Sequence, residues 1–393
     1  MKIRYNKKNL YYLFLVLPFF FPTAFAGAAV GTLIKGYKII VGLIIVFYML
    51  KKHEMSPLLL LLSSFYGIVC VSALWHGLEI DNWIIQILFL WLINYLTHDW
   101  QSLKRFLHIY VNLYSVLMLI NLATMIIFPN GLYSSSAYNL NWFLGYKNVI
   151  IRLLLPYLAL MLVENVIDNG TLKFTKTNKL LFAATIISIL LSKSFNSWIG
   201  MAIFLILIWR IKANKPLTKY MIAKSFVLYC ATDFAMLKLD FLSVFQNLIV
   251  NVLEKNASER GRLAIWNRTL ELIPKSPFTG YGGITNEMYN IAFKVSHPHN
   301  LLLYYLMLGG IVGVIILLFS MILTEQTSEK RQEKKTIIVN RIIADLYVAY
   351  FAMGYLESLT GAIMMIPMLV VMYNINSMRM GSDADENRIM HTI

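Results

Sequence analysis

The sequence predicts an all-α polytopic membrane protein with about twelve transmembrane helices. Three observations support this class: the composition, the number of apolar runs and the placement of basic residues. Of the 393 residues, 58% are hydrophobic and 14% are charged, and the mean hydropathy is +0.63. A soluble domain is about half apolar and a quarter charged. The composition therefore excludes a cytosolic globular enzyme, a disordered chain and a fibrous protein.

Apolar runs long enough to cross or nearly cross a bilayer recur along the whole chain. The runs are 10–25, 39–50, 57–75, 83–96, 106–128, 149–166, 180–191, 198–211, 221–237, 301–323, 342–356 and 363–375. Twelve helices of roughly 20 residues would use about 240 residues, which agrees with the apolar share. The weakest run is 221–237, because it contains Asp233. We find no internal repeat in the sequence and treat 1–393 as a single polytopic membrane domain.

The formal net charge of +15 reflects membrane orientation more than a ligand. If the N-terminus is cytoplasmic, 23 of the 35 basic residues fall in cytoplasmic segments, as the positive-inside rule requires. We therefore expect a multi-pass protein of the cytoplasmic (inner) membrane with both termini in the cytoplasm. The basic balance then gives no reason to expect nucleic acid as a partner. Cys70 and Cys230 lie in apolar runs and predict neither a disulfide framework nor a metal site.

A loop at 240–300, before the tenth predicted helix, is the longest polar interruption of the chain. Loops of this length inside a compact domain are usually functional or disordered. Apolar residues recur at helical spacing along 258–274, namely Leu263, Trp266, Leu270 and Ile273. This pattern predicts an amphipathic helix, in which Trp266 is by default a packing anchor. A glycine-rich stretch follows, and His297-Pro298-His299-Asn300 closes the loop at the start of the next helix.

Arg260 and Arg262 have two interpretations. One is ordinary surface pairing, such as Glu259 with Arg262 at i, i+3, which contributes a few tenths of a kcal/mol. The other is a phosphate clamp, because guanidinium binds phosphate oxygens in a bidentate manner and keeps its charge.

His297 and His299 also have two interpretations: polar residues at a helix start near lipid headgroups, or a general base. A zinc site is weakly supported, because no Cys and few outer carboxylates complete a ligand set. We expect neither a metal nor a cofactor.

Five short motifs occur in a fixed order along the second half of the chain. They are Arg262-x-x-x-Trp266, Ile273-Pro274-x-x-Pro277, Gly280-Tyr281-Gly282, His297 to Asn300, and Leu308 to Gly313. This ordered set resembles the superfamily of Wzy-type polysaccharide polymerases and WaaL-type O-antigen ligases. The upstream segment Trp142 to Asn148, with Arg152, resembles the family's outer motif. Where the family usually has a Ser-Arg-like motif this chain has Ser192-Lys193-Ser194, so the role of Lys193 stays open.

The resemblance implies a GT-C-like membrane glycosyltransferase whose long extracytoplasmic loop contains short helices. Its donor would be an oligosaccharide repeat unit on undecaprenyl pyrophosphate, joined into capsular or surface polysaccharide at the outer face of the membrane. A ligase-type transfer of finished glycan to another acceptor is the alternative. Membrane lipid, a chain-length regulator and a flippase would be its partners. A lipid-glycan flippase or transporter is the rival from another class, but it predicts inverted repeats and a polar site at mid-membrane.

The chemistry of such a transfer fits these residues without a metal. Pyrophosphate is already a good leaving group, so the carboxylate pair of glycosidases is not needed. We expect His299 as base and Arg262 as the group that stabilises the departing pyrophosphate, with His297 as the other candidate base. The expected substrate-binding residues are Arg260, Arg152, Lys147, His297, Trp266 and Asn300. Asp233 and Glu357 receive no assignment.

Overall fold

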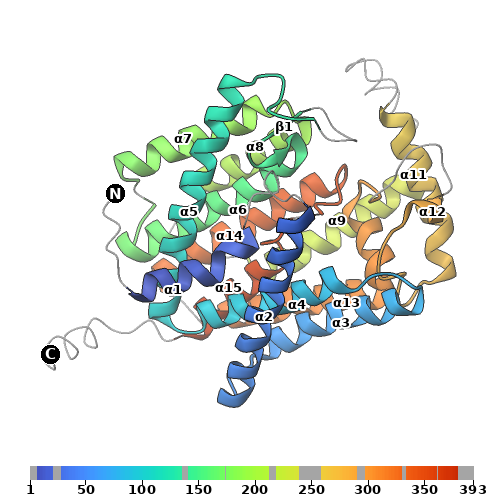
Figure 1. Ribbon diagram of the computed structural model, residues 1–393, viewed down its shortest axis with the longest axis horizontal. Coiled ribbons are helices and arrows are strands. Elements are labelled where there is room, and N and C mark those ends of the chain that lie inside the picture. Colours follow the sequence, from blue (N-terminus) through green and yellow to red (C-terminus); the bar gives the residue numbers. More distant parts are fainter. Residues whose placement is uncertain are drawn as a thin grey trace, which may run out of the picture.

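The computed structural model agrees with the all-α class. It describes residues 7–20, 28–134, 140–172, 174–211, 218–238, 258–289, 297–329, 333–360 and 362–378. Within these ranges the regular structure is helical except for one two-residue hairpin, in which β1 (Asn141–Trp142) pairs antiparallel with β2 (Gly145–Tyr146). Figure 1 shows the helices gathered into a single assembly.

Every predicted apolar run overlaps a helix. The helices are α1 (Lys7–Val16), α2 (Ala28–Lys52), α3 (Pro57–Trp75), α4 (Asp81–Thr97), α5 (Trp100–Ile127), α6 (Lys147–Asn169), α7 (Lys176–Leu191), α8 (Phe195–Trp209), α9 (Met221–Lys238), α11 (Ser258–Leu272), α12 (Asn286–Tyr289), α13 (Leu301–Glu329), α14 (Lys334–Gly354) and α15 (Pro367–Ser377). Short 3₁₀ helices continue α1 at Leu17–Phe20 and α11 at Ile273–Lys275.

Six of the described helices are long and apolar enough to cross a membrane: α2, α3, α5, α6, α13 and α14. A membrane protein is therefore the right class, whereas the number twelve stays a prediction. Polar residues between the apolar runs begin several of these helices. Ser56, Asp99 and Thr175 each accept a backbone hydrogen bond as the N-cap of α3, α5 and α7, and Pro57 follows Ser56 at a position where its missing N–H costs nothing.

The helix ends fall into two sets because neighbouring helices alternate in direction. At one set, Lys51 and Lys52 end α2, and Lys335 at the start of α14 donates to the Ile167 carbonyl near the end of α6 (3.2 Å). The starts of α6, α8 and α13 and the ends of α9 and α14 form the other set. The candidate motifs of the sequence lie at this second set, together with α11 and α12 (Figure 1).

Helix α13 is broken at Gly310, which has φ 60° and ψ −160°. A loop that we call the glycine loop, residues 276–283, fits into the break. Four backbone hydrogen bonds join the two: Tyr281 N–H to Met307 C=O (2.7 Å), Gly282 N–H to Leu308 C=O (2.9 Å), Ile311 N–H to Pro277 C=O (2.9 Å) and Val312 N–H to Phe278 C=O (3.1 Å). Groups that the break would leave unpaired in lipid are thus satisfied within the protein.

The glycine loop also packs closely against α3. Ser72 on α3 donates its hydroxyl to the Gly280 carbonyl at 2.6 Å. Gly282 has φ +74°, and a Cβ there would lie 2.1 Å from the Ala73 backbone nitrogen. The loop is therefore held between α3 and α13, and only glycine fits at this point.

The predicted amphipathic helix is α11, and it reaches the bundle through its apolar face. Trp266 is buried in a small cluster with Ile265, Leu303 and Tyr289, and its Nε1–H donates to the Pro298 carbonyl at 2.7 Å. The Thr269 hydroxyl lies 2.9 Å from the hydroxyl of Tyr289 on α12. These contacts hold α11 directly against the His-Pro-His-Asn segment.

The close approach at Gly282 generates a stability prediction. Gly282→Ala forces a side chain into the left-handed region, which costs about 1 kcal/mol or more, and adds the clash with α3. We expect a clearly lower melting temperature in detergent. Gly67→Ala is the matched control, because a Cβ at Gly67 on α3 meets nothing within 4 Å. Equal melting of the two variants would contradict the proposed packing of the glycine loop.

Candidate active site

Two histidines and one glutamate meet at the start of α13. The rings of His297 and His299 lie with centroids 4.1 Å apart, and each Nδ1 is 3.6 Å from Oε1 of Glu357. Glu357 belongs to the segment that follows α14. The side chain of His299 is 26% exposed against 11% for His297. His299 is therefore the ring that a substrate can reach more easily.

Arg152 of α6 completes this cluster as the partner of Glu357. Its Nη2 lies 3.0 Å from Oε1 of Glu357, and both side chains are almost fully buried. Its Nη1 donates to the carbonyl and to the hydroxyl of Thr360. A buried charge is tolerated only when it is paired and hydrogen-bonded, and the two residues satisfy this condition for each other. Arg152 and Thr360 are 208 residues apart in the chain.

The cluster shifts the protonation of its members in opposite ways. Burial alone would raise the pKa of Glu357, but the close approach of His299 and the charge of Arg152 hold that pKa well below its usual range. Burial, together with His299, Arg152 and Arg262, lowers the pKa of His297 to about 3 against the opposing charge of Glu357. At neutral pH Glu357 is therefore ionised and His297 is neutral.

Asn300 fixes the position of the histidine segment. Its side-chain oxygen accepts from the Leu303 N–H (2.9 Å), so Asn300 is the N-cap of α13. Its amide nitrogen donates to both carboxylate oxygens of Asp233 on α9, each at 2.9 Å. Its backbone N–H donates to the Ser358 hydroxyl at 3.1 Å. Asn300 thus ties the start of α13 to α9 and to the residue after Glu357.

Helix α11 brings Arg262 to the same place. Arg262 lies one turn before Trp266, whose indole is bonded to Pro298 between the two histidines. The positive charge of Arg262 acts on His297, as stated above, and the side chain is partly exposed. Arg260 is part of α11, but its side chain lies outside the described residues.

The upstream outer motif joins the cluster through α6 and α8. Asn148 and Arg152 are one turn apart on α6, and the Asn148 side-chain oxygen accepts from the Ser194 hydroxyl at 2.8 Å. Lys147 is the first residue of α6 and is partly exposed. The Ser192-Lys193-Ser194 segment therefore contacts the motif that contains Asn148, which places Lys193 near this edge of the site.

Backbone strain is concentrated around these residues. Among the described non-glycine residues, five have positive φ, and three of them lie here: Lys193 (54°), His299 (52°) and Leu359 (53°). Non-glycine residues rarely adopt this region, and such residues often mark functional sites. Each of the three is next to a residue with a hydrogen bond in the site.

The ligand atoms of His297, His299 and Glu357 lie within 4.8 Å of one another and are a geometrically acceptable set for a metal ion. Arg152, however, places a guanidinium 3.0 Å from a carboxylate oxygen of Glu357, one of the three residues that would bind the ion. A divalent cation there would face a fixed positive charge at short range. The charge arrangement thus favours a proton or an anion over a cation.

The structure brings most of the predicted site residues together. His297, His299, Asn300 and Arg152 share one cluster, Arg262 and Trp266 lie against it from α11, and Lys147 stands at its edge. The sequence assigned no role to Glu357 or Asp233, and it did not single out Ser358 or Thr360. For Glu357 and Asp233, the only signal in the sequence was an ionisable residue in or beside a predicted membrane helix.

Comparison with curated proteins found no match. The family model described as O-antigen ligase matches residues 180–318, a range that includes α11, the glycine loop, the histidine segment and the break in α13. This match covers about a third of the chain and supports the resemblance of its motifs to the O-antigen ligase/polymerase superfamily.

Proposed function

We propose that this protein joins oligosaccharide repeat units carried on undecaprenyl pyrophosphate into a surface polysaccharide. The main support is the arrangement of His299, Glu357 and Arg152 in one buried cluster, with Arg262 presented to it from α11. Such a cluster contains a candidate base, a carboxylate that orients it and, in Arg262, an available cation for a pyrophosphate. The match to a family of glycan-transferring enzymes supports the same reaction type.

In the proposed step, a hydroxyl of the acceptor sugar attacks the anomeric carbon of the donor sugar. The new C–O bond forms as the bond from that carbon to the pyrophosphate oxygen breaks. The acceptor proton passes to His299, and the lipid pyrophosphate leaves with its electron pair. General base catalysis of this kind contributes roughly 10²–10⁴-fold in rate.

The surroundings of His299 suit a base. The Glu357 carboxylate faces Nδ1 and favours a proton on that nitrogen, which leaves Nε2 as the acceptor (Nδ1–Oε1 3.6 Å). Arg262 is partly exposed and supplies a charge to the departing pyrophosphate. Arg152 is already bonded to Glu357 and Thr360. In this proposal its charge therefore acts on the pyrophosphate only from the buried side of the cluster.

A ligase of the same superfamily is the alternative, and it would use the same donor with a different acceptor. A flippase is less well supported, because the described polar cluster lies at helix ends and beside α11. A chain-length regulator and a flippase remain expected partners of the polymerase. The proposed location is the cytoplasmic membrane, with both termini in the cytoplasm and the site on the outer face.

The first prediction concerns the two catalytic candidates. We expect His299→Ala and Arg262→Ala to lower polymer formation by at least about 100-fold, while both variants still insert into the membrane. Purified variants would be supplied with lipid-linked repeat units, and the products resolved as a ladder on a gel. Arg268→Ala is the matched control on α11, because Arg268 pairs with Glu271 at 2.7 Å and donates to the Met288 carbonyl at 3.2 Å, not to the histidine segment.

Normal high-molecular-weight glycan from both alanine variants would refute the assignment. His297→Ala, measured beside His299→Ala, tests which ring is the base. If only His297→Ala removes the reaction, the two roles are reversed.

The second prediction concerns pH. The pKa of His297 is about 3 in the folded protein and near 6.5 when unfolded, so the unfolded chain binds more protons between these values. Stability should therefore fall as the pH drops from 7 to 5, by up to about 2 kcal/mol from this residue. The depressed pKa of Glu357 adds a further loss below its unfolded value. Melting in detergent measures this effect, and His297→Gln should melt with a weaker pH dependence. An identical slope in the variant would contradict the burial of a neutral His297.

The third prediction concerns orientation. In a variant without Cys70 and Cys230, single cysteines would be placed at two exposed positions, Glu271→Cys on α11 and Lys51→Cys at the end of α2. A membrane-impermeant maleimide should label position 271 in intact cells and position 51 only after lysis. The opposite labelling pattern would show that the site faces the cytoplasm.

A further inference from the structure

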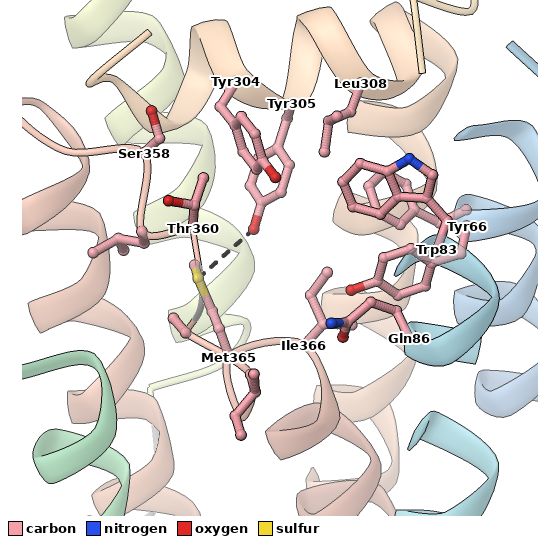
Figure 2. A pocket seen from close by; sticks show the side chains of 14 residues that line it. Tyr66, Trp83, Gln86, Tyr304, Tyr305, Leu308, Ser358, Thr360, Met365 and Ile366 are labelled. Carbon is pink, nitrogen blue, oxygen red and sulfur yellow. Dashed lines mark hydrogen bonds between the residues drawn. The ribbon is translucent and has the colours of Figure 1, made fainter. Parts of the chain in front are cut away.

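A cavity of about 80 Å³ lies next to the histidine cluster, beside the first turns of α13. It lies between α3, α4, the first turns of α13 and the segment after α14. At roughly 10–15 Å³ for each water molecule, it has room for several. Figure 2 shows Ser358 and Thr360 on one side, Tyr66, Trp83 and Gln86 on the other, and Tyr304 and Tyr305 between them.

One part of the cavity wall is aromatic. Tyr66 and Trp83 are stacked with ring centroids 6.4 Å apart and an interplanar angle of 25°. Tyr304 and Tyr305 contribute two further rings from the first turn and a half of α13. Aromatic rings offer broad apolar faces together with a polar edge, a combination that suits a ligand with both C–H faces and hydroxyl groups.

Four polar groups on this wall have no hydrogen-bond partner within the part of the chain that the structure describes. They are the amide of Gln86, the indole N–H of Trp83 and the hydroxyls of Tyr66 and Tyr304. Each of these groups keeps some exposure, so each is available to hydrogen-bond with a ligand that enters the cavity. The cavity thus presents several unused donors and acceptors on aromatic walls.

The opposite side of the cavity borders the candidate active site through Ser358 and Thr360. The Ser358 hydroxyl donates to the Asn300 carbonyl (3.2 Å), and the Thr360 hydroxyl accepts from Arg152 (3.0 Å). Glu357 directly precedes Ser358 in the chain. A ligand in the cavity would therefore lie beside the group that orients His299.

From these contacts, we propose that the cavity binds one sugar ring of the lipid-linked glycan, adjacent to the glycosidic position that reacts. This inference rests on the proposed function and adds a binding subsite to it, formed chiefly by Trp83, Gln86, Tyr66 and Tyr304. Sugar hydroxyls satisfy the four polar groups, and the C–H face of the ring packs on the aromatic wall. A prenyl chain would leave all four groups unpaired inside a membrane protein.

The test uses the full-length protein in detergent and two probes. The sugar probe is the oligosaccharide released by mild acid from the lipid-linked repeat units of cells that lack this gene. The lipid probe is undecaprenyl pyrophosphate without sugar. The variants are Gln86→Leu and Tyr304→Phe, which remove a polar group and keep most of the volume. Their matched controls are Gln101→Leu and Tyr373→Phe, which change residues that do not line the cavity.

We expect the sugar probe to raise the melting temperature of the wild type and of both controls. In Gln86→Leu and Tyr304→Phe its apparent Kd should rise about fivefold to tenfold, as for the loss of one hydrogen bond. The lipid probe should bind all five proteins alike. Unchanged sugar binding in both variants would overturn the proposal, as would a loss of lipid binding in the variants, which would assign the cavity to the prenyl chain.

Transfer assays on the same preparations separate this proposal from the proposed function. If the wild type makes no polymer but the variants still lose sugar binding, the function fails and the subsite stands. If the wild type polymerises and the variants have an unchanged KM, only the subsite fails. A third outcome is a raised KM of the variants for the free sugar end of the acceptor while the rate of donor cleavage before the steady state is unchanged. In that case the sugar ring in the cavity belongs to the acceptor. The reverse result assigns it to the donor.

Discussion

A helix that breaks within a membrane leaves N–H and C=O groups that lipid cannot satisfy, and this constraint organises the whole site. In α13 the break at Gly310 is filled by the glycine loop, whose own turns would otherwise need water. Neither part is stable at that depth without the other. Because the loop follows α11 in the chain, satisfying the break also fixes where α11 can lie. Trp266 then meets Pro298, and the histidine segment is enclosed between α11, α9 and the end of α14.

Charge within the site is arranged so that the buried part is already neutralised. Arg152 and Glu357 compensate each other inside the protein, while Arg262 approaches from a helix with access to solvent. A pyrophosphate arriving from the membrane would therefore meet one available cation and one carboxylate that is shielded by its own partner. The lowered pKa of His297 follows first from burial and then from the same crowding of positive charge.

The membrane class, the helix of 258–272 and the grouping of His297, His299, Asn300, Arg262 and Trp266 could be predicted, because period and motif order are local signals. The break in α13 could not, since Leu308 to Gly313 reads as part of one apolar run. Glu357 and Arg152 meet across more than 200 positions, and no local pattern encodes that pairing. The same applies to Asp233. In the sequence this residue weakens the prediction of a membrane helix at 221–237, whereas in the structure its carboxylate accepts a hydrogen bond from the Asn300 side-chain amide.

The left-handed backbone of His299 has a consequence for how this position can vary. Glycine, or to a lesser degree asparagine, would adopt φ 52° with less strain than histidine. A chain with glycine there should fold somewhat more readily and lack the base of the proposed mechanism. Histidine at this position therefore reduces folding stability in return for placing an imidazole beside Glu357. Random mutagenesis with selection for thermal stability alone should replace the histidine at this position and lose the proposed activity. A screen that measures both stability and transfer would show that the two properties favour different residues here.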